Sequence, residues 1–375
     1  MKKILLFGAY SDNNLGDDLI LLLVNRLINR KQAMPLVLNR YGMNDFFTNN
    51  YNFVDNFIYN PEYNNKKLKR MLKIKTEKIE KIDTLFFIGG GYSNEKFGIM
   101  NLIKMNILIN EYSKSKVPIY FFGQTIGPSK SKLGYKILKN IYSKGKNVYV
   151  RENYSINFFR KEIKTELVGD DAYLSYEDFE KNKVEKENII VNMKDFANND
   201  EYYNDYLNMI TNISKKINNE IHIVPFRNDK NSKEYKLNDK LYKDLKKKEI
   251  KCKFCVIQTY QELINEFSSA ITVIGSAYHS VVLGLIAGAN VYGIYNGEYY
   301  EQKIKGVLNL YDMSENNTIS IKNLSVESEK FINEIVTKGL KENEKISDAS
   351  KAIYKRVLKK YNETIDSIKE GKING

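Results

Sequence analysis

One stretch of the sequence constrains the fold more than any other. Residues Ala270–Tyr295 read AITVIGSAYHSVVLGLIAGANVYGIY, which predicts a buried strand over Ile271–Ile274, a helix from about His279 to Ala287 and a second buried strand over Val291–Tyr295. The two strands are short apolar runs rich in β-branched residues, and a glycine stands near each end of the helix. A strand, a helix and a second strand in this order form the repeating unit of a parallel α/β sheet.

His279 falls in the turn between the first of these strands and the helix. In open α/β sheets ligands bind beyond the carboxyl ends of the strands, and the start of a helix offers N–H groups and a positive dipole end to an anion. The sequence therefore predicts a phosphate or carboxylate site that includes Ser276 and His279. The alternative interpretation is a histidine that only caps the helix and packs against its neighbours.

Apolar runs alternate with helical segments along most of the chain, which predicts an α/β protein with two Rossmann-like domains that face a cleft. Further strands are expected at Lys2–Tyr10, Pro35–Asn39, Thr84–Ile88, Pro118–Phe122, Val148–Val150, Ile189–Met193, Ile221–Pro225 and Cys252–Ile257. A charged segment without apolar periodicity at 175–187 predicts a linker. We therefore expect an N-terminal domain over residues 1–180, a C-terminal domain over 187–325 and C-terminal helices over 326–375.

The first loop, SDNNLGDD, joins the strand Lys2–Tyr10 to a helix expected over Leu19–Asn29. It has neither the GxGxxG spacing nor the Lys-Ser/Thr pair of nucleotide-binding loops. Carboxylates at a helix start repel phosphate, so a neutral, hydroxyl-rich ligand is expected here. Its candidate contacts are Asn14, Gly16, Asp17 and Asp18, and Asp17 is also a candidate base. Capping of the helix by Asp17 or Asp18 is the alternative.

Three more strand ends carry residues suited to a ligand site. Gly89–Gly91 follow one strand, Gly123–Pro128 (GQTIGP) follow the next, and Arg151 follows Val148–Val150. Glycines let the backbone approach a ligand closely, and arginine grips carboxylate or phosphate with a planar fork. The candidates are Gly90 and Gly91 for close approach of the backbone to a ligand, and Gly123, Gln124, Arg151, Lys194 and Arg227 for contact with an anionic ligand. The alternatives are a surface ion pair of Arg151 with Glu152, and solvated charges at Lys194 and Arg227.

The charge of the chain is spread widely. Lysine and arginine number 59 against 46 acidic residues, a net charge of +13. Basic and aromatic residues do not gather in one module, so a nucleic-acid binder is not expected. A basic helix expected over Lys66–Lys81 suits either peripheral contact with an anionic membrane or a solvated face. With no secretory signal and no window of spanning length, we expect a cytoplasmic protein, with contact at the inner membrane face left open.

The chain has two cysteines, Cys252 and Cys255, and two histidines, His222 and His279. One CxxC cannot complete a four-cysteine zinc site, so the sequence predicts no metal site and no tightly bound cofactor. The two cysteines lie in an apolar run and are expected to be reduced and structural, with a redox pair as the alternative. His222 lies within an expected strand and is interpreted as structural.

Six motifs occur in order, each at or near the end of an expected strand. They are NNLGDD (Asn13–Asp18), IGGG (Ile88–Gly91), GQTIGP (Gly123–Pro128), VRENYS (Val150–Ser155), GDDA (Gly169–Ala172) and SAYHS (Ser276–Ser280). Together they resemble the polysaccharide pyruvyl transferase family. The resemblance implies a GT-B-like fold and transfer of the enolpyruvyl unit of phosphoenolpyruvate, the co-substrate, to a sugar acceptor of a cell-surface polysaccharide or its lipid-linked precursor.

The resemblance also implies roles by position. The N-terminal domain is the acceptor side, with Asn14, Gly16, Asp18, Gly90 and Gly91 as acceptor contacts, and the C-terminal domain is the donor side. The donor contacts are Gly123, Gln124, Arg151, Lys194, Arg227 and Ser276. His279 matches the family histidine near phosphoenolpyruvate, a proton donor, and Arg151 matches the arginine after the fifth strand. The chain departs from the pattern at Ala277, where the family usually has arginine, at Lys194, where arginine is common, and at Asp171, which replaces a common proline. Lys194 and Arg227 are expected to help hold the donor in place of the missing arginine.

Two other functions fit the same sequence. A GT-B-type glycosyltransferase would use a nucleotide sugar on a similar scaffold, and a non-catalytic relative would bind glycans without releasing phosphate from phosphoenolpyruvate. The acceptor sugar and the oligomeric state are left open.

Overall fold

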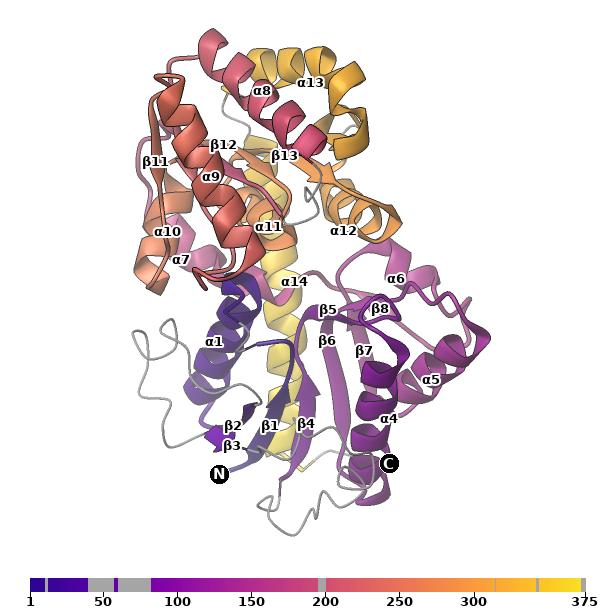
Figure 1. Cartoon of the computed structure of the whole chain (residues 1–375). Helices are drawn as coiled ribbons and strands as arrows, with labels where there is room; N and C mark the ends of the chain where they lie inside the picture. Colours follow the sequence, from indigo (N-terminus) through magenta and orange to yellow (C-terminus); the bar gives the residue numbers. More distant parts are fainter. Residues whose placement is uncertain are drawn as a thin grey trace. The chain divides into compact units, whose positions relative to one another are not determined.

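Two parallel β-sheets organise the computed structural model (Figure 1), which describes residues 1–10, 13–39, 57–59, 82–194, 200–313, 315–341 and 344–371. The chain divides into two compact units. Unit 1 contains Met1–Asp12, Asp17–Leu174 and Ile353–Gly375, and unit 2 contains Asn13–Gly16 and Ser175–Ala352. An α/β protein with two Rossmann-like sheets is therefore confirmed, and each unit is described by itself below.

The sheet of unit 1 has eight parallel strands among the described residues, in the order β3-β2-β1-β4-β6-β7-β8, with β5 paired to β6. The strands are β1 (Lys3–Phe7), β2 (Met34–Asn39), β3 (Phe57–Tyr59), β4 (Thr84–Phe87), β5 (Gly90–Ser93), β6 (Ile119–Ile126), β7 (Asn147–Val150) and β8 (Glu166–Leu167). β4 and β6 are buried along their whole length, as parallel strands covered on both faces should be. The chain reverses direction of travel across the sheet between β1 and β4, which is the topological switch point.

Helices cover both faces of this sheet. They are α1 (Leu15–Arg30), α4 (Ile99–Lys114), α5 (Lys132–Tyr142), α6 (Asn153–Asn157) and the second half of α14 (Glu344–Lys369). α4 and α5 pack on the face that carries Phe87 and Phe121. On the other face, the Tyr361 ring of α14 stacks on Phe122 with ring centroids 3.9 Å apart and planes 10° from parallel. The last helix thus supplies part of the core of unit 1.

The sheet of unit 2 repeats the same topology. Its six parallel strands run in the order β11-β10-β9-β12-β13-β14, with the switch point between β9 and β12. The strands are β9 (Asn188–Asn192), β10 (Glu220–Ile223), β11 (Cys252–Phe254), β12 (Ala270–Gly275), β13 (Asn290–Tyr295) and β14 (Thr318–Ser320). The helices are α7 (Tyr176–Lys181), α8 (Asp200–Lys216), α9 (Lys233–Lys247), α10 (Tyr260–Ser268), α11 (Tyr278–Ile286), α12 (Glu298–Leu308), α13 (Leu324–Lys338) and the first half of α14.

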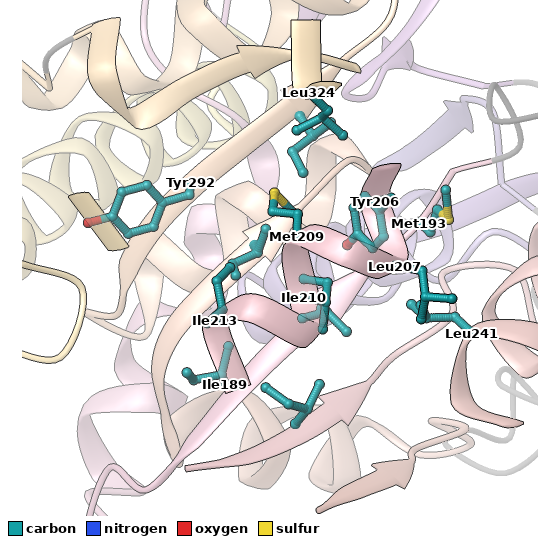
Figure 2. Close-up of a cluster of buried hydrophobic side chains, with 14 of the residues drawn as sticks. Ile189, Met193, Tyr206, Leu207, Met209, Ile210, Ile213, Leu241, Tyr292 and Leu324 are labelled. Carbon is teal, nitrogen blue, oxygen red and sulfur yellow. The ribbon is translucent and has the colours of Figure 1, made fainter. Parts of the chain in front are cut away.

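Alternate residues of these strands face opposite sides. One side packs against α8, α9 and α13 in the cluster of Figure 2, where Ile189 of β9 and Tyr292 of β13 meet Ile210 and Ile213 of α8 and Leu324 of α13. The other side packs against α11, because a Cβ at Gly284 of α11 would come within 3 Å of valines on β12 and β13. It also contacts α10, whose Glu266 is hydrogen-bonded to His222 of β10. Ser232 caps α9, and Thr259 forms a capping box with Glu262 at the start of α10.

The expected strands are confirmed, with three corrections to neighbouring segments. β6 continues to Ile126, so most of GQTIGP is strand rather than loop. The first helix begins at Leu15, so Asp17 and Asp18 lie in its first turn and do not cap it. The expected linker contains the helix α7, whose Tyr176 and Phe179 are buried. The basic segment Lys66–Lys81 lies outside the described residues.

Candidate active site

The start of α11 stands at the switch point of unit 2, directly after β12. Its nine residues Tyr278–Ile286 are all buried, because a helix that is apolar all round needs protein on every side. Ala277 precedes it without a side-chain cap. His279 is in the first turn, with 6% of its surface exposed, so it is held in a defined place rather than free in solvent.

Ser276 fastens this turn to the end of β9. Its hydroxyl donates to the Asn192 carbonyl at 2.8 Å and accepts from the Lys194 backbone N–H at 2.8 Å. The Asn192 side chain accepts from the Ala277 N–H at 2.8 Å and donates to the Val224 carbonyl at 3.0 Å. Hydrogen bonds of the buried Ser276 and Asn192 side chains therefore connect the carboxyl ends of β9, β10 and β12. In this structure Ser276 positions Lys194 and the start of α11.

The first motif of the sequence is part of unit 2. The Leu15 N–H donates to the Phe226 carbonyl at 2.9 Å, and Asn14 forms an isolated antiparallel bridge with Arg227. The Asn14 side chain accepts from the Gly16 N–H at 3.2 Å, which is the hydrogen bond expected of a helix cap. Asn14 therefore caps α1 and fixes the segment against the loop after β10.

Gly16 lies against His279. A Cβ added at Gly16 would overlap the imidazole ring and come within 2.5 Å of the His279 Cβ. Gly16 is buried, and its contact with an acceptor sugar stays a prediction. Its place beside His279 explains why a residue without a side chain stands there.

The cations predicted to hold the donor occupy different surroundings. The Lys194 ammonium lies 3.7 Å from the buried Glu234 carboxylate and 5.7 Å from the centre of the Tyr300 ring. Arg227 is partly exposed, and its backbone pairs with Asn14. Lys303 lies 4.7 Å from the ring centre of Tyr278, the residue next to His279. Unit 2 thus brings Ser276, His279, Lys194 and Arg227 to one edge of its sheet.

Arg151 belongs to a buried network in unit 1. Its side chain has no exposed surface, and its guanidinium donates to Asp170 at 2.6 Å and to the Thr125 hydroxyl at 2.7 Å. Glu152, also buried, accepts from Thr125 at 3.2 Å and from Ser155. Arg151 and Glu152 do form an ion pair, with 3.6 Å between Nε and a carboxylate oxygen, but both side chains are buried, so the expected location of this pair on the surface is wrong. A buried guanidinium already paired with a carboxylate does not offer its fork to a ligand, so the structure favours a positioning role for Arg151 in unit 1.

Gln124 and Gly123 also lie in the interior of unit 1. The Gln124 amide donates to the carbonyls of Phe122 at 2.7 Å and Ile88 at 2.9 Å, and its oxygen accepts from Tyr142 at 3.3 Å. Gln124 is fully buried. Gly123 has φ +54, and a Cβ there would lie 2.9 Å from the Asp171 carboxylate. In this structure the two residues join β6 to its neighbours, and their place in a donor site stays a prediction.

Asp171 connects two of the glycine motifs. Its carboxylate accepts from the Gly89 N–H at 2.7 Å. Burial, and then the nearby charge of Asp170, raise the pKa of Asp171 to about 7. A carboxyl that is neutral in mildly acidic solution therefore sits beneath the ends of β4 and β6.

The remaining acceptor candidates lie in unit 1. Gly90 and Gly91 open β5, where Gly91 is partly exposed and Gly90, at φ +156, lies against the Tyr92 ring. Asp17 is partly exposed, whereas Asp18 has 1% of its surface exposed. Of this group Asp17 and Gly91 keep access to solvent, and Asp18 and Gly90 do not.

Comparison with known families decides the relationship. The family model for polysaccharide pyruvyl transferase matches residues 14–298, more than half of the chain.

The chain belongs to the polysaccharide pyruvyl transferase family.

Solved structures show the fold of this pyruvyl transferase family member. UDP-GlcNAc 2-epimerase from Methanocaldococcus jannaschii is similar with a TM-score of 0.57 at 14% identity, covering 96% of this chain and 100% of that one. Alr3699/HepE from Anabaena, in complex with UDP and glucose, has a TM-score of 0.56 at 10% identity, and the match covers 99% of this chain and 100% of that one. MurG from Acinetobacter baumannii has a TM-score of 0.53 at 11% identity, and the match covers 99% of this chain and 100% of that one. A GT-B-like arrangement of elements is confirmed, and comparison with curated proteins gives no match.

Sequence reasoning missed one cluster altogether. His222, Cys255 and Glu266 come together in unit 2, with one potential ligand atom from each lying within 4.8 Å of the others. The sequence shows no metal-ligand spacing, because these residues come from β10, the end of β11 and α10. A usable signal was present, since consecutive strands in an α/β chain often pair and would bring His222 beside the CxxC.

No helix among the described residues combines the length and the apolar character needed to cross a bilayer.

Proposed function

We propose that this family member transfers the pyruvyl group of phosphoenolpyruvate to a sugar of a cell-surface polysaccharide or its lipid-linked precursor. The observation that carries the proposal is the position of His279. It stands at the switch point of the unit 2 sheet, in the first turn of a buried helix, with Gly16 of the first motif against its ring. A ligand site is expected at such a position in this class of fold.

The chemistry requires three contributions. A sugar hydroxyl adds to C2 of phosphoenolpyruvate while a proton is delivered to C3, and phosphate then leaves as a second hydroxyl adds to C2 and closes the ketal. The acid has to be protonated near neutral pH, which histidine can supply. The carboxylate and phosphate of the donor need cations, and the hydroxyl needs a base.

We assign these contributions to the residues that remain suited to them. His279 is the general acid, and Lys194 and Arg227 are the cations for the donor. The N–H groups at the start of α11 add positive potential, and Ala277 leaves that helix start without a side chain over it. Asp17, partly exposed and next in the chain to Gly16, is the candidate base. Arg151 supports unit 1 and does not contact the donor.

The test is acceptor-dependent release of phosphate from phosphoenolpyruvate. Wild-type protein should release phosphate in the presence of a glycan that can accept the pyruvyl group. The His279→Gln variant should release none, while its circular dichroism spectrum stays that of the wild type. Full activity of His279→Gln would remove His279 from the mechanism. Binding is measured separately by thermal shift, because a ligand at a hundred times its dissociation constant adds about 2.7 kcal/mol of stability.

The same thermal-shift assay separates the two alternatives. HepE is described in complex with UDP and glucose, so UDP-sugars are the matched competitors to phosphoenolpyruvate. A shift with UDP-sugars and none with phosphoenolpyruvate would replace the proposal with nucleotide-sugar transfer. Binding of glycans with no phosphate release would indicate the non-catalytic relative.

A further inference from the structure

Three potential metal ligands of different chemistry converge on one side of the unit 2 sheet. His222 lies on β10, Cys255 follows β11, and Glu266 lies on α10, which packs over these strands. The His222 Nδ1 and the Glu266 carboxylate are in direct hydrogen-bond contact. Nδ1, Sγ and a carboxylate oxygen all lie within 4.8 Å of one another. None of these residues contributes to the site at the start of α11.

Strand alternation separates the two cysteines. Cys252 is aligned with Ile221 of β10 and belongs to the apolar cluster of Figure 2. Cys255 is three residues further on, so it faces the other side, where Glu266 contributes to the surroundings of its thiol. Both cysteines are free and buried, and their surroundings differ: Cys252 packs in the apolar cluster and Cys255 lies beside His222 and Glu266. Cys255 is therefore available to the His222 and Glu266 side chains.

We propose that His222 Nδ1, Cys255 Sγ and a Glu266 carboxylate oxygen bind a divalent zinc ion. Imidazole, thiolate and carboxylate are all ligands of zinc, whereas a thiolate argues against magnesium or calcium. Ligand atoms about 2.0 to 2.3 Å from a tetrahedral zinc lie about 3.3 to 3.8 Å apart. Side-chain shifts of about 1 Å would bring the three atoms to that spacing and place the ion between His222 and Glu266.

The surroundings suit this ion in charge and orientation. One thiolate and one carboxylate neutralise a divalent cation, so the occupied site carries no net charge in a place where His222 is 9% and Cys255 7% exposed. Glu220 lies 3.5 Å from the other ring nitrogen of His222. A carboxylate on the second nitrogen orients a ligating histidine and strengthens it as a ligand. A water molecule would complete the tetrahedral set as the fourth ligand.

Coordination requires the thiol to lose its proton. Burial raises the pKa of Cys255 to about 12, with a further contribution from the charge of Glu266. When the zinc–sulfur bond forms, the thiol proton passes to the buffer and the cation replaces it as the partner of the sulfur. No oxidation or reduction takes part.

The experiment is calorimetric titration of Zn²⁺ into the full chain, produced without a histidine tag and treated with chelator. Wild-type protein should bind about one equivalent. Cys255→Ser should weaken binding by more than about a hundredfold, and Glu220→Gln, outside the ligand set, by about 10- to 100-fold. Cys252→Ser, in the same motif but on the opposite face, is the matched control and should bind as wild type does.

Two results would overturn the proposal. One is the lack of stoichiometric binding by wild-type protein at about 100 μM zinc, and the other is equal weakening by Cys252→Ser and Cys255→Ser. Co²⁺ provides a measurement that does not depend on variants that fold. Wild-type protein loaded with Co²⁺ should show a thiolate-to-cobalt charge-transfer band, and a spectrum without that band rules out Cys255 as a ligand.

Discussion

Gly16 and His279 are 263 positions apart in sequence and in contact in the structure, where the Gly16 backbone leaves no space for a Cβ beside the imidazole. The first motif and the last motif of the family pattern therefore meet in unit 2. The contact restricts the ring on one side and so helps to hold a proposed acid in one orientation. It also makes the identity of residue 16 a test of the site.

We predict that Gly16→Ala destabilises the protein by about 1–3 kcal/mol and strongly reduces transfer activity, because the new methyl group has to displace His279. Helix propensity alone predicts the opposite sign, since alanine in a helix is favoured over glycine by about 1 kcal/mol. The free energies of unfolding of the wild type and Gly16→Ala, measured by urea denaturation, decide between these two opposite expectations. In a His279→Gly background the cost should be smaller, because the ring and the Cβ that the new methyl group overlaps have both gone. An equal cost in both backgrounds would show that the ring is not the obstacle.

Removal of the Arg151 side chain should affect stability rather than donor affinity. Arg151→Ala leaves Asp170 buried without its partner, which is expected to cost about 3–5 kcal/mol. The comparison is Lys139→Ala, which breaks an exposed pair with Glu162 and should cost less than about 1 kcal/mol. If Arg151→Ala were as stable as wild type but had a much higher KM for phosphoenolpyruvate, Arg151 would be a donor ligand after all.

Asp171 should give the protein a pH-dependent stability between its two pKa values. In the unfolded chain the carboxyl titrates near its usual value of 3.8, and in the folded chain at about 7. Its contribution is complete below the lower value and is lost as the pH rises to about 7, because the unfolded state ionises first. Over that window the free energy of unfolding of Asp171→Asn should rise relative to that of the wild type by on the order of 4 kcal/mol. Stability curves that stay parallel from pH 4 to pH 7 would contradict this.

Lys194→Met should weaken phosphoenolpyruvate binding about 10- to 100-fold, since a charge-assisted contact contributes about 1.5–3 kcal/mol. Titration by thermal shift measures this without turnover. Lys243→Met removes an exposed lysine of α9 that is paired with Asp239 and should leave the affinity unchanged. A similar loss in both variants would point to the general positive charge of the chain rather than to Lys194.

The strands and helices of this fold can be predicted from the local sequence. The contacts that their polar side chains make in the interior cannot. Buried parallel strands read as apolar runs, so β9 and β12 are visible in the sequence, and their order follows the usual α/β topology. Gln124 and Arg151 look like ligands because they are polar residues at strand ends. Whether such a side chain turns outward or inward depends on partners such as Tyr142 and Asp170, which are distant in sequence or themselves ambiguous.

The proposed zinc cluster shows the opposite case, in which residues that do not look like ligands in the sequence are brought together by the fold. Metal motifs are recognised by short spacing, and His222, Cys255 and Glu266 have none. The CxxC draws attention to Cys252 and Cys255 as a pair, although a strand places successive odd and even positions on opposite faces. Only the packing of α10 over β10 and β11 reveals which cysteine lies beside His222 and Glu266.

The stacking of Tyr361 on Phe122 has a consequence for biosynthesis. The strands of unit 1 leave the ribosome early, but residues 353–371, which cover one face of that sheet, follow only after the whole of Ser175–Ala352. A nascent chain that has reached the end of unit 2 still exposes the aromatic face around Phe122. Co-translational folding of the first half is therefore incomplete until α14 arrives, and a fragment that ends near residue 174 should aggregate unless Ile353–Gly371 is supplied with it.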